Sequence, residues 1–230
     1  MSRTNTDSID WRHSYISTFL EKDIPQLGIN IGAQTLRRFW NMIVVYHGNI
    51  LNASEIGRSL GIAHTTVQHY LDILTGTFMI RQLKPWHENI SKRQVKSPKI
   101  YFRDSGILHT FLRIANEKDL KNDPKLGSSW EGFALEQIIE KSHIRREDCY
   151  FWSTHTGAEL DLLIFKGKKR FGYEFKFADQ PRLTKSMITA KNDLKLDSLT
   201  IVHPGVGDFP LEKSIRAIGL KEVLESFDSG

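Results

Sequence analysis

Cysteine and long apolar runs are both scarce in this chain of 230 residues. Its one cysteine, Cys149, can form neither an internal disulfide nor a cysteine-rich zinc site, so oxygen or histidine would have to hold any bound metal. The longest apolar run, 42–46, is far shorter than the roughly 18 to 20 residues of a membrane helix. Residues 1–15 are too polar for a signal peptide. We therefore expect a cytoplasmic protein with no membrane association.

No segment matches the Gly-x-x-x-x-Gly-Lys-Ser/Thr loop that binds nucleotide phosphates, so we expect no ATPase activity from this chain alone. No internal repeat is visible, which argues against a solenoid. Lysine and arginine exceed aspartate and glutamate by 32 to 27, and the sequence pI is about 9.2. This excess of positive charge makes polyanions such as DNA reasonable partners.

A polar run at residues 115–127 divides the chain. It contains Pro124 and Gly127 and shows no apolar periodicity, which is typical of a connection. We therefore predict a helical, winged helix-turn-helix domain at 1–114, a linker at 115–127 and a second domain at 128–230.

The first predicted domain contains a helix-turn-helix pattern. Apolar residues recur at helical spacing over 53–74, and Gly61 interrupts them where two short helices need a tight turn. Strand patterns at 77–85 and 99–102 follow, joined by the polar, basic stretch 87–98. Two helices followed by a β-ribbon predict a winged helix.

Polar and basic side chains of this domain are candidates for nucleic-acid binding. Short polar groups near the start of a recognition helix can reach base edges, and basic groups can hold the phosphate backbone. The candidates are Arg58, Thr65, Thr66, Gln68, His69, Lys92, Arg93 and Lys96. Because this fold also packs against protein modules, DNA contact and protein contact are alternatives at this point.

The second predicted domain mixes helices and strands. A helix pattern after residue 127 precedes a strand at 149–154, two strands around a tight turn at 158–178, a helix at 184–196 and a buried strand at 199–204. A further strand near 215–218 and a C-terminal helix complete the chain. The order α-β-β-β-α-β makes the protein an α/β (α+β) chain.

The hairpin at 158–178 contains the most informative side chains. A two-residue turn at Gly167 and Lys168 pairs Asp161 with Glu174, and it pairs Glu159 with Lys176. Regular alternation places these four side chains on one face of the sheet. The other face is predicted to hold Leu160, Leu162, Ile164, Tyr173, Phe175 and Phe177.

Two carboxylates opposite each other would have Cβ atoms about 5 Å apart, which destabilises a hairpin. A divalent cation between Asp161 and Glu174 would remove the repulsion, and oxygen ligands favour Mg²⁺ or Mn²⁺. Lys176 supplies a positive charge on the same face. The alternative is a solvated polar face on which Glu159 and Lys176 form an ion pair.

These residues resemble the motif of the PD-(D/E)xK nuclease superfamily, which has a restriction-endonuclease-like fold. Asp161 matches the first acid, Glu174 and Lys176 match the Glu-x-Lys half, and Glu131 matches a helix acid of one branch. The resemblance implies a catalytic set of all four residues, with Mg²⁺ or Mn²⁺ bound by Asp161, Glu174 and the main-chain carbonyl of Phe175. The proline that commonly precedes the first acid is absent. Ser128-x-x-Glu131 also fits a helix capping box.

Most of the chain is similar to the C-terminal region of a large family of bacterial and archaeal AAA-like ATPases. The similar blocks are 19–29, 35–86, 96–112, 128–139, 159–164 and 173–176. The resemblance implies a nucleic-acid-binding protein with a metal-dependent phosphodiesterase site that works with an ATPase module or another protein partner. The alternative is a non-catalytic module that binds DNA or a partner and targets an ATPase, with the nuclease fold kept as a scaffold.

Overall fold

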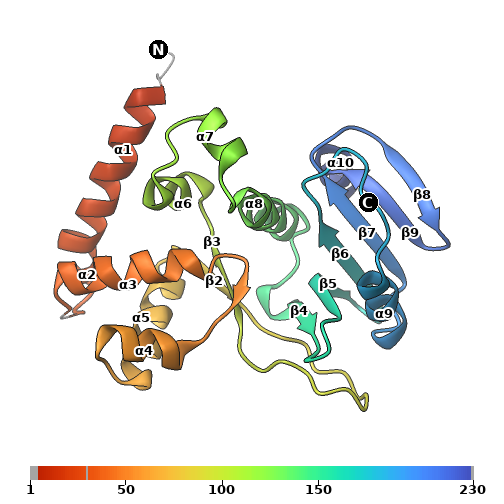
Figure 1. Cartoon of the computed structure of the whole chain (residues 1–230), viewed down its shortest axis with the longest axis horizontal. Helices are drawn as coiled ribbons and strands as arrows, with labels where there is room; N and C mark the ends of the chain where they lie inside the picture. The colour runs from red at the N-terminus through yellow and green to blue at the C-terminus, as the bar shows by residue number, and fades with distance from the viewer. Residues whose placement is uncertain (1–4, 30, 229–230) are drawn as a thin grey trace. The chain divides into compact units, whose positions relative to one another are not determined.

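The computed structural model describes residues 5–29 and 31–228, and the chain forms two units. The first contains the residues up to Arg81 together with Ile100–Ser129, and the second contains Gln82–Lys99 and the residues from Trp130 onward (Figure 1). The predicted mixed α+β class is confirmed, with two separate sheets. No helix in the described part of the chain is both long and apolar enough to cross a membrane.

The first unit is mainly helical. Its core contains the fully buried Leu36, Phe39, Trp40 and Leu71. A small sheet, in the order β1-β3-β2, accompanies the helices. The elements are α1 (Asn5–Thr18), a π-helix (Phe19–Asp23), α2 (Ile24–Gln26), α3 (Ala33–Val45), β1 (Asn49–Ile50), α4 (Ala53–Leu60), α5 (His64–Gly76), β2 (Ile80–Leu83), β3 (Lys99–Phe102), α6 (Ser105–Leu112) and α7 (Glu117–Asn122).

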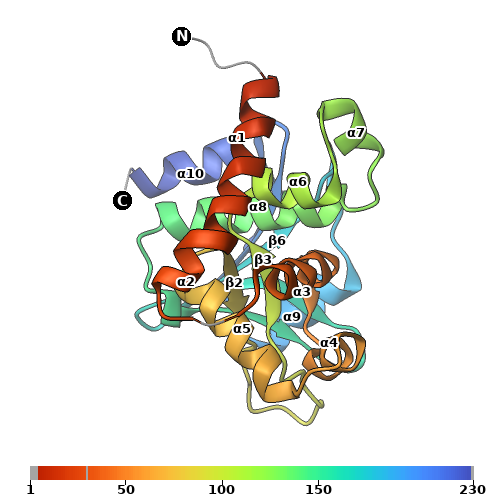
Figure 2. The ribbon, with the colours of Figure 1, turned by 90° about the vertical axis from the view of Figure 1, so that its left-hand side faces the viewer.

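The two short helices predicted around Gly61 are confirmed as α4 and α5, which lie side by side (Figure 2). The side chain of Asn52 caps α4 by accepting the Glu55 N–H at 3.1 Å. Gly61 ends α4 with φ of 68°, a conformation that favours glycine. A Cβ on Gly57 would lie 2.8 Å from the Ile62 carbonyl, so glycine allows the turn to approach α4 closely.

His47 connects three segments of this unit through a buried imidazole that is 1% exposed. The Phe102 N–H donates to Nδ1 at 3.0 Å, and Nε2 lies 3.0 Å from the Ser128 carbonyl. These partners are both satisfied only by a neutral ring with its proton on Nε2. Burial accordingly lowers the pKa of His47 to about 4.

We expect the first unit to lose stability as the pH falls from about 6.5 to about 4, because the unfolded chain binds a proton that the folded His47 resists. The lowered pKa corresponds to about 3 kcal/mol, fully present above the ordinary histidine pKa. Urea unfolding across this range should show a flatter pH dependence for His47→Gln. The flattening should be partial, since burial also lowers the pKa of His109. His69→Gln, at an exposed position on α5, should keep the wild-type slope.

The second unit contains a six-stranded sheet in the order β4-β5-β6-β7-β9-β8. Strands β6, β7 and β9 are parallel, and the other neighbouring pairs are antiparallel. The elements are α8 (Leu126–Lys141), a 3₁₀-helix (Arg146–Asp148), β4 (Cys149–Ser153), β5 (Glu159–Lys166), β6 (Lys169–Phe175), α9 (Lys185–Asp193), β7 (Ser198–His203), β8 (Asp208–Glu212), β9 (Ile215–Gly219) and α10 (Leu220–Asp228). The predicted order of elements from α8 to β7 is confirmed, and β8 was not predicted.

The connection between β2 and β3 differs from the free ribbon of the predicted winged helix. Residues 82–99 belong to the second unit, where they run along the edge strand β4. Phe151 exchanges backbone hydrogen bonds with Lys84 and Trp86, and the Val95 N–H donates to the Ser153 carbonyl. The physical reason is that an edge strand has unpaired backbone groups, which this segment satisfies.

The predicted linker also contains regular structure. Helix α7 lies within 115–127, and α8 begins at Leu126. The side chain of Asn116 accepts the Asp119 N–H at 3.0 Å and so caps α7, while Glu117 and Asp119 suit the positive end of the helix dipole. Capping thus stabilises a short helix whose sequence has little apolar periodicity.

Candidate active site

The predicted pairing of β5 with β6 is confirmed. Leu162 lies opposite Tyr173 and Lys166 lies opposite Lys169, with Gly167 and Lys168 as the two-residue turn. Gly167 has φ of 63°, as the first central residue of a type II′ turn requires. The paired residues end at Leu162 and Tyr173, one residue before the predicted pair of Asp161 and Glu174.

Regular alternation along β5 is the part of the prediction that is wrong. On its other side, β5 pairs with β4 so that Tyr150 is opposite Leu163 and Trp152 is opposite Leu160. Two steps along β4 therefore correspond to three along β5. The additional residue forms a β-bulge at Asp161 and Leu162, which changes the direction of the side chains around it.

The bulge changes which side chains share a face. Leu160 and Leu163 belong to one core with Met187 of α9, although alternation would place them on opposite faces. A Cβ on Gly172 would lie 3.3 Å from the Leu160 side chain. Gly172 and Glu174 share a face of β6. Leu160 therefore lies on the same face of the sheet as Glu174, whereas the prediction placed it on the other face.

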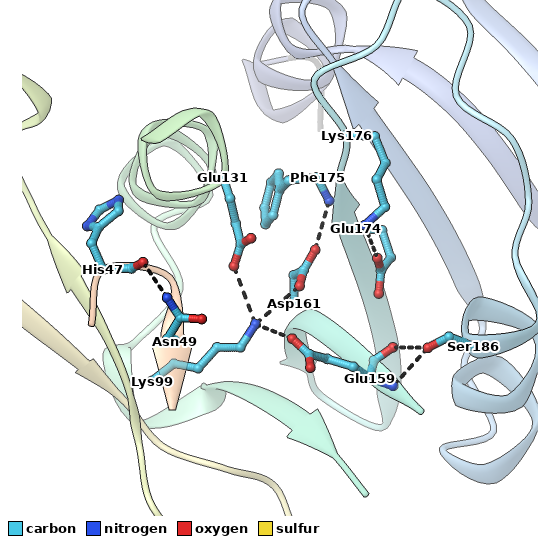
Figure 3. Close-up of polar contacts among 10 residues, drawn as sticks. All are labelled: His47, Asn49, Lys99, Glu131, Glu159, Asp161, Glu174, Phe175, Lys176 and Ser186. Carbon is cyan, nitrogen blue, oxygen red and sulfur yellow. Dashed lines mark hydrogen bonds and ion pairs between the residues drawn. The ribbon is translucent and has the colours of Figure 1, made fainter. Parts of the chain in front are cut away.

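Asp161 and Glu174 are both buried, at 5% and 4% exposure. Asp161 Oδ2 accepts the Phe175 N–H at 3.1 Å, which fixes the carboxylate against β6 (Figure 3). Burial raises the pKa of Glu174 well above its usual value, and the charge of Asp161 raises it further. The two carboxylates thus repel each other in a site with little water.

Lys176 contacts Glu174 rather than its predicted partner Glu159. Its Nζ lies 3.1 Å from Glu174 Oε2, and its side chain is 42% exposed. Burial alone would lower the pKa of Lys176, but the charges of Glu174 and Asp161 outweigh this effect and raise it. Lys176 is therefore a charged ammonium beside the carboxylates, accessible from solvent.

Lys99 is a central residue of the site that the sequence analysis missed. Its Nζ lies 3.3 Å from both Glu131 Oε1 and Asp161 Oδ1 and forms an ion pair with Glu159 (Figure 3). The side chain is 3% exposed, and Nζ lies 5.6 Å from the centre of the Phe151 ring. A lysine that begins the apolar strand 99–102 is a signal in the sequence, because lysine is almost never fully buried without a partner.

Glu131 joins the site through Lys99. The predicted capping box with Ser128 is wrong, because α8 begins at Leu126 and Glu131 lies beyond its first turn. The Ser128 hydroxyl instead donates to the Lys125 carbonyl at 3.1 Å. Glu159 is held from the other side by Ser186 of α9, whose hydroxyl accepts the Glu159 N–H at 2.9 Å.

The donor set fits a hard divalent cation with few protein ligands. Within residues 5–29 and 31–228, no group of three or more His, Cys, Asp or Glu side chains is arranged to hold a metal. The predicted set contains two carboxylates and one main-chain carbonyl, and Mg²⁺ commonly keeps several waters as its other ligands. Burial first and the charge of Asp161 second raise the pKa of Glu174, and a bound cation would offset both effects.

The predicted nucleic-acid-binding residues are divided between the two units. Arg58, Thr65 and His69 are exposed in the first unit, where Thr66 and Gln68 are half-buried. The exposed Lys92, Arg93 and Lys96 belong to the second unit. Lys92 forms an ion pair of 2.7 Å with Asp193 of α9.

Two protein-family models match the chain. One is described as a domain of unknown function (DUF8612) and matches residues 1–118, so the chain belongs to this family. The other is described as a domain of unknown function (DUF4143) and matches residues 126–223. The second domain is often found in AAA-like ATPase proteins.

Two curated relatives are uncharacterised proteins of Mycobacterium tuberculosis and Mycobacterium bovis. Each is 45% identical over 223 residues, which are 97% of this chain and 50% of the relative. The chain thus spans about half the length of the curated relatives it matches. A solved structure of protein VC1899 from Vibrio cholerae is 13% identical, with a TM-score of 0.28 over 99% of this chain and 56% of that chain. This similarity is too low to bear on the fold.

Proposed function

We propose that the second unit is a metal-dependent phosphodiesterase that cleaves nucleic acid. The observation that supports this most directly is the burial of two mutually repelling carboxylates, Asp161 and Glu174, beside the charged Lys176. A hairpin that serves only stability gains nothing from like charges at this position. Functional sites are where such perturbed groups gather.

Asp161, Glu174 and the main-chain carbonyl of Phe175 would hold Mg²⁺ or Mn²⁺. The bound cation would make water a better nucleophile and offset negative charge on the phosphate. The hydrogen bond from the Phe175 N–H keeps Asp161 in one orientation. Glu131 and Glu159, both paired with Lys99, would accept hydrogen bonds from water around the site.

Lys176 has the role that depends most on its charge. Its raised pKa keeps the ammonium protonated near neutral pH, so it can orient an attacking water or stabilise charge that develops on the phosphate oxygens. It is also the most exposed of the charged groups around Asp161 and Glu174, which allows it to meet a substrate from solvent. None of these groups reads bases, so sequence preference would come from the first unit or from a partner.

We also propose that this phosphodiesterase works with an ATPase module. The domain matched at 126–223 is often found in AAA-like ATPase proteins, and the curated relatives are about twice as long as the region matched here. The helix pair α4 and α5 exposes Thr65 and His69 and could contact DNA or that module. DNA is the partner we favour, because the chain has a net charge of +5.

Cleavage of linear, nicked and branched DNA with Mg²⁺ or Mn²⁺ tests this proposal. We expect cleavage that EDTA abolishes and that falls about 100-fold or more in both Asp161→Asn and Lys176→Ala. Asp193→Asn, which removes only the surface ion pair with Lys92, is the matched control and should retain wild-type activity. Activity that survives in Asp161→Asn and Lys176→Ala would overturn the assigned site.

A second candidate function is a non-catalytic module that binds DNA or docks a partner of an ATPase. The observation that favours it is Lys99, whose ammonium contacts three carboxylates and offsets part of their charge. DNA binding that is intact in a chain with no cleavage and no response to Mn²⁺ would support this alternative.

A further inference from the structure

Three aromatic side chains form a cluster that the proposed chemistry does not use. The Trp130 ring centre lies 6.2 Å from that of Phe133 and 6.0 Å from that of Phe177. Phe133 is 42% exposed and Phe177 is 46% exposed, whereas the other phenylalanines described in this unit are buried or half-buried. The planes are inclined by 43° and 66°, so neither phenylalanine stacks face to face with the indole.

The cluster adjoins the candidate active site through two neighbouring pairs in the chain. Trp130 directly precedes Glu131 on α8, and Phe177 directly follows Lys176. Consecutive Cα atoms are about 3.8 Å apart, so the rings originate within one residue of groups that surround the carboxylates. Lys176, with its exposed ammonium, lies between Glu174 and Phe177 in the chain.

We propose that Trp130, Phe133 and Phe177 form a stacking surface for unpaired bases next to the scissile phosphate, which makes single-stranded or frayed nucleic acid the preferred substrate. The proposal rests on the proposed phosphodiesterase function. Every base has an apolar face that stacks on aromatic rings, independently of sequence. In a regular duplex those faces are covered by neighbouring bases, so only unpaired nucleotides can use the surface.

Charge supports a nucleic acid as the occupant of this surface. An apolar partner peptide would gain nothing from the exposed ammonium of Lys176, while a phosphate attached to a stacked nucleoside would meet that charge. The carboxylates and Lys176 would act on the phosphodiester but do not recognise bases. The three aromatic side chains would supply that recognition.

Binding can be measured separately from cleavage. Full-length chain carrying Asp161→Asn would be titrated into a labelled thymidine oligonucleotide and into an abasic oligonucleotide with the same number of phosphates. We expect tighter binding of the thymidine strand by about tenfold or more, since base stacking contributes about that much per base. Phe177→Ala and Phe133→Ala should remove most of this difference. Neither substitution should change the affinity for the abasic strand.

Ile188→Ala is the matched control, because Ile188 is an exposed apolar residue of α9 in the same unit. It should keep the preference for the thymidine strand. Equal affinity for both strands, or an equal loss in Ile188→Ala and Phe177→Ala, would overturn the stacking surface even if the wild-type chain cleaves DNA. A base-dependent affinity in a chain that does not cleave would instead contradict the phosphodiesterase while retaining the stacking surface.

Discussion

Replacing Lys99 with methionine is expected to lower the free energy of unfolding of the second unit by about 3 to 5 kcal/mol near neutral pH. The methionine keeps most of the side-chain volume but removes a charge that contacts Glu131, Glu159 and Asp161 together. The buried Asp161 and its two neighbouring carboxylates would then lack the ammonium that offsets their charge. Hydrogen exchange of the β5 and β6 amides, together with urea unfolding, measures this effect.

The loss in Lys99→Met should shrink as the pH falls, because protonated carboxyl groups no longer repel. Lys92→Met is the matched control, since Lys92 forms an ion pair with Asp193 while its side chain is 40% exposed. Exposed pairs contribute less than about 1 kcal/mol. A Lys99→Met chain as stable as the Lys92→Met chain would show that the carboxylates do not depend on the buried ammonium.

Replacing Glu174 with glutamine is expected to change stability and cleavage in opposite directions. The raised pKa of Glu174 means that the folded chain favours the protonated carboxyl group. The stability that results is present below the ordinary glutamate pKa and is lost as the pH rises through the folded pKa. Glutamine does not titrate. The variant should therefore be more stable than the wild type at about pH 8.

Cleavage by Glu174→Gln should fall by about 100-fold or more, because a neutral amide cannot replace the carboxylate that we propose as a metal ligand. The control is Glu88→Gln. Hydrogen bonds from Trp86 and Arg170 outweigh burial and lower the pKa of Glu88, so its replacement should destabilise the chain. If Glu174→Gln is also less stable than the wild type at about pH 8, the carboxylate repulsion is not the dominant effect at this position.

The parts of the fold that depend on local chemistry could be predicted from the sequence. Gly167 fixes the hairpin turn and hence the register of β5 and β6 as far as Leu162 and Tyr173, the neighbours of Asp161 and Glu174 in the chain. Gly61 likewise separates α4 from α5, because its positive φ ends the first helix. In both cases a single glycine determines the backbone over a few residues.

The parts that depend on distant pairing could not be predicted. The sequence places residues 82–99 in the first domain because the composition changes only at 115–127, yet in the structure they pair with the edge of β4 in the second unit. Lys99 was missed for the same reason, since its carboxylate partners lie at least 32 residues away in the chain. Short-range periodicity contains no information about such contacts.

The bulge at Asp161 and Leu162 makes the length of this hairpin as important as its composition. Deleting one residue there would restore a regular ladder with β4, but it would also shift every preceding side chain relative to β6. A chain could therefore keep the same acids and lysine and still lose the arrangement through one missing codon. The number of residues in homologous hairpins is thus a more sensitive indicator of an intact site than the presence of the acidic and lysine residues alone.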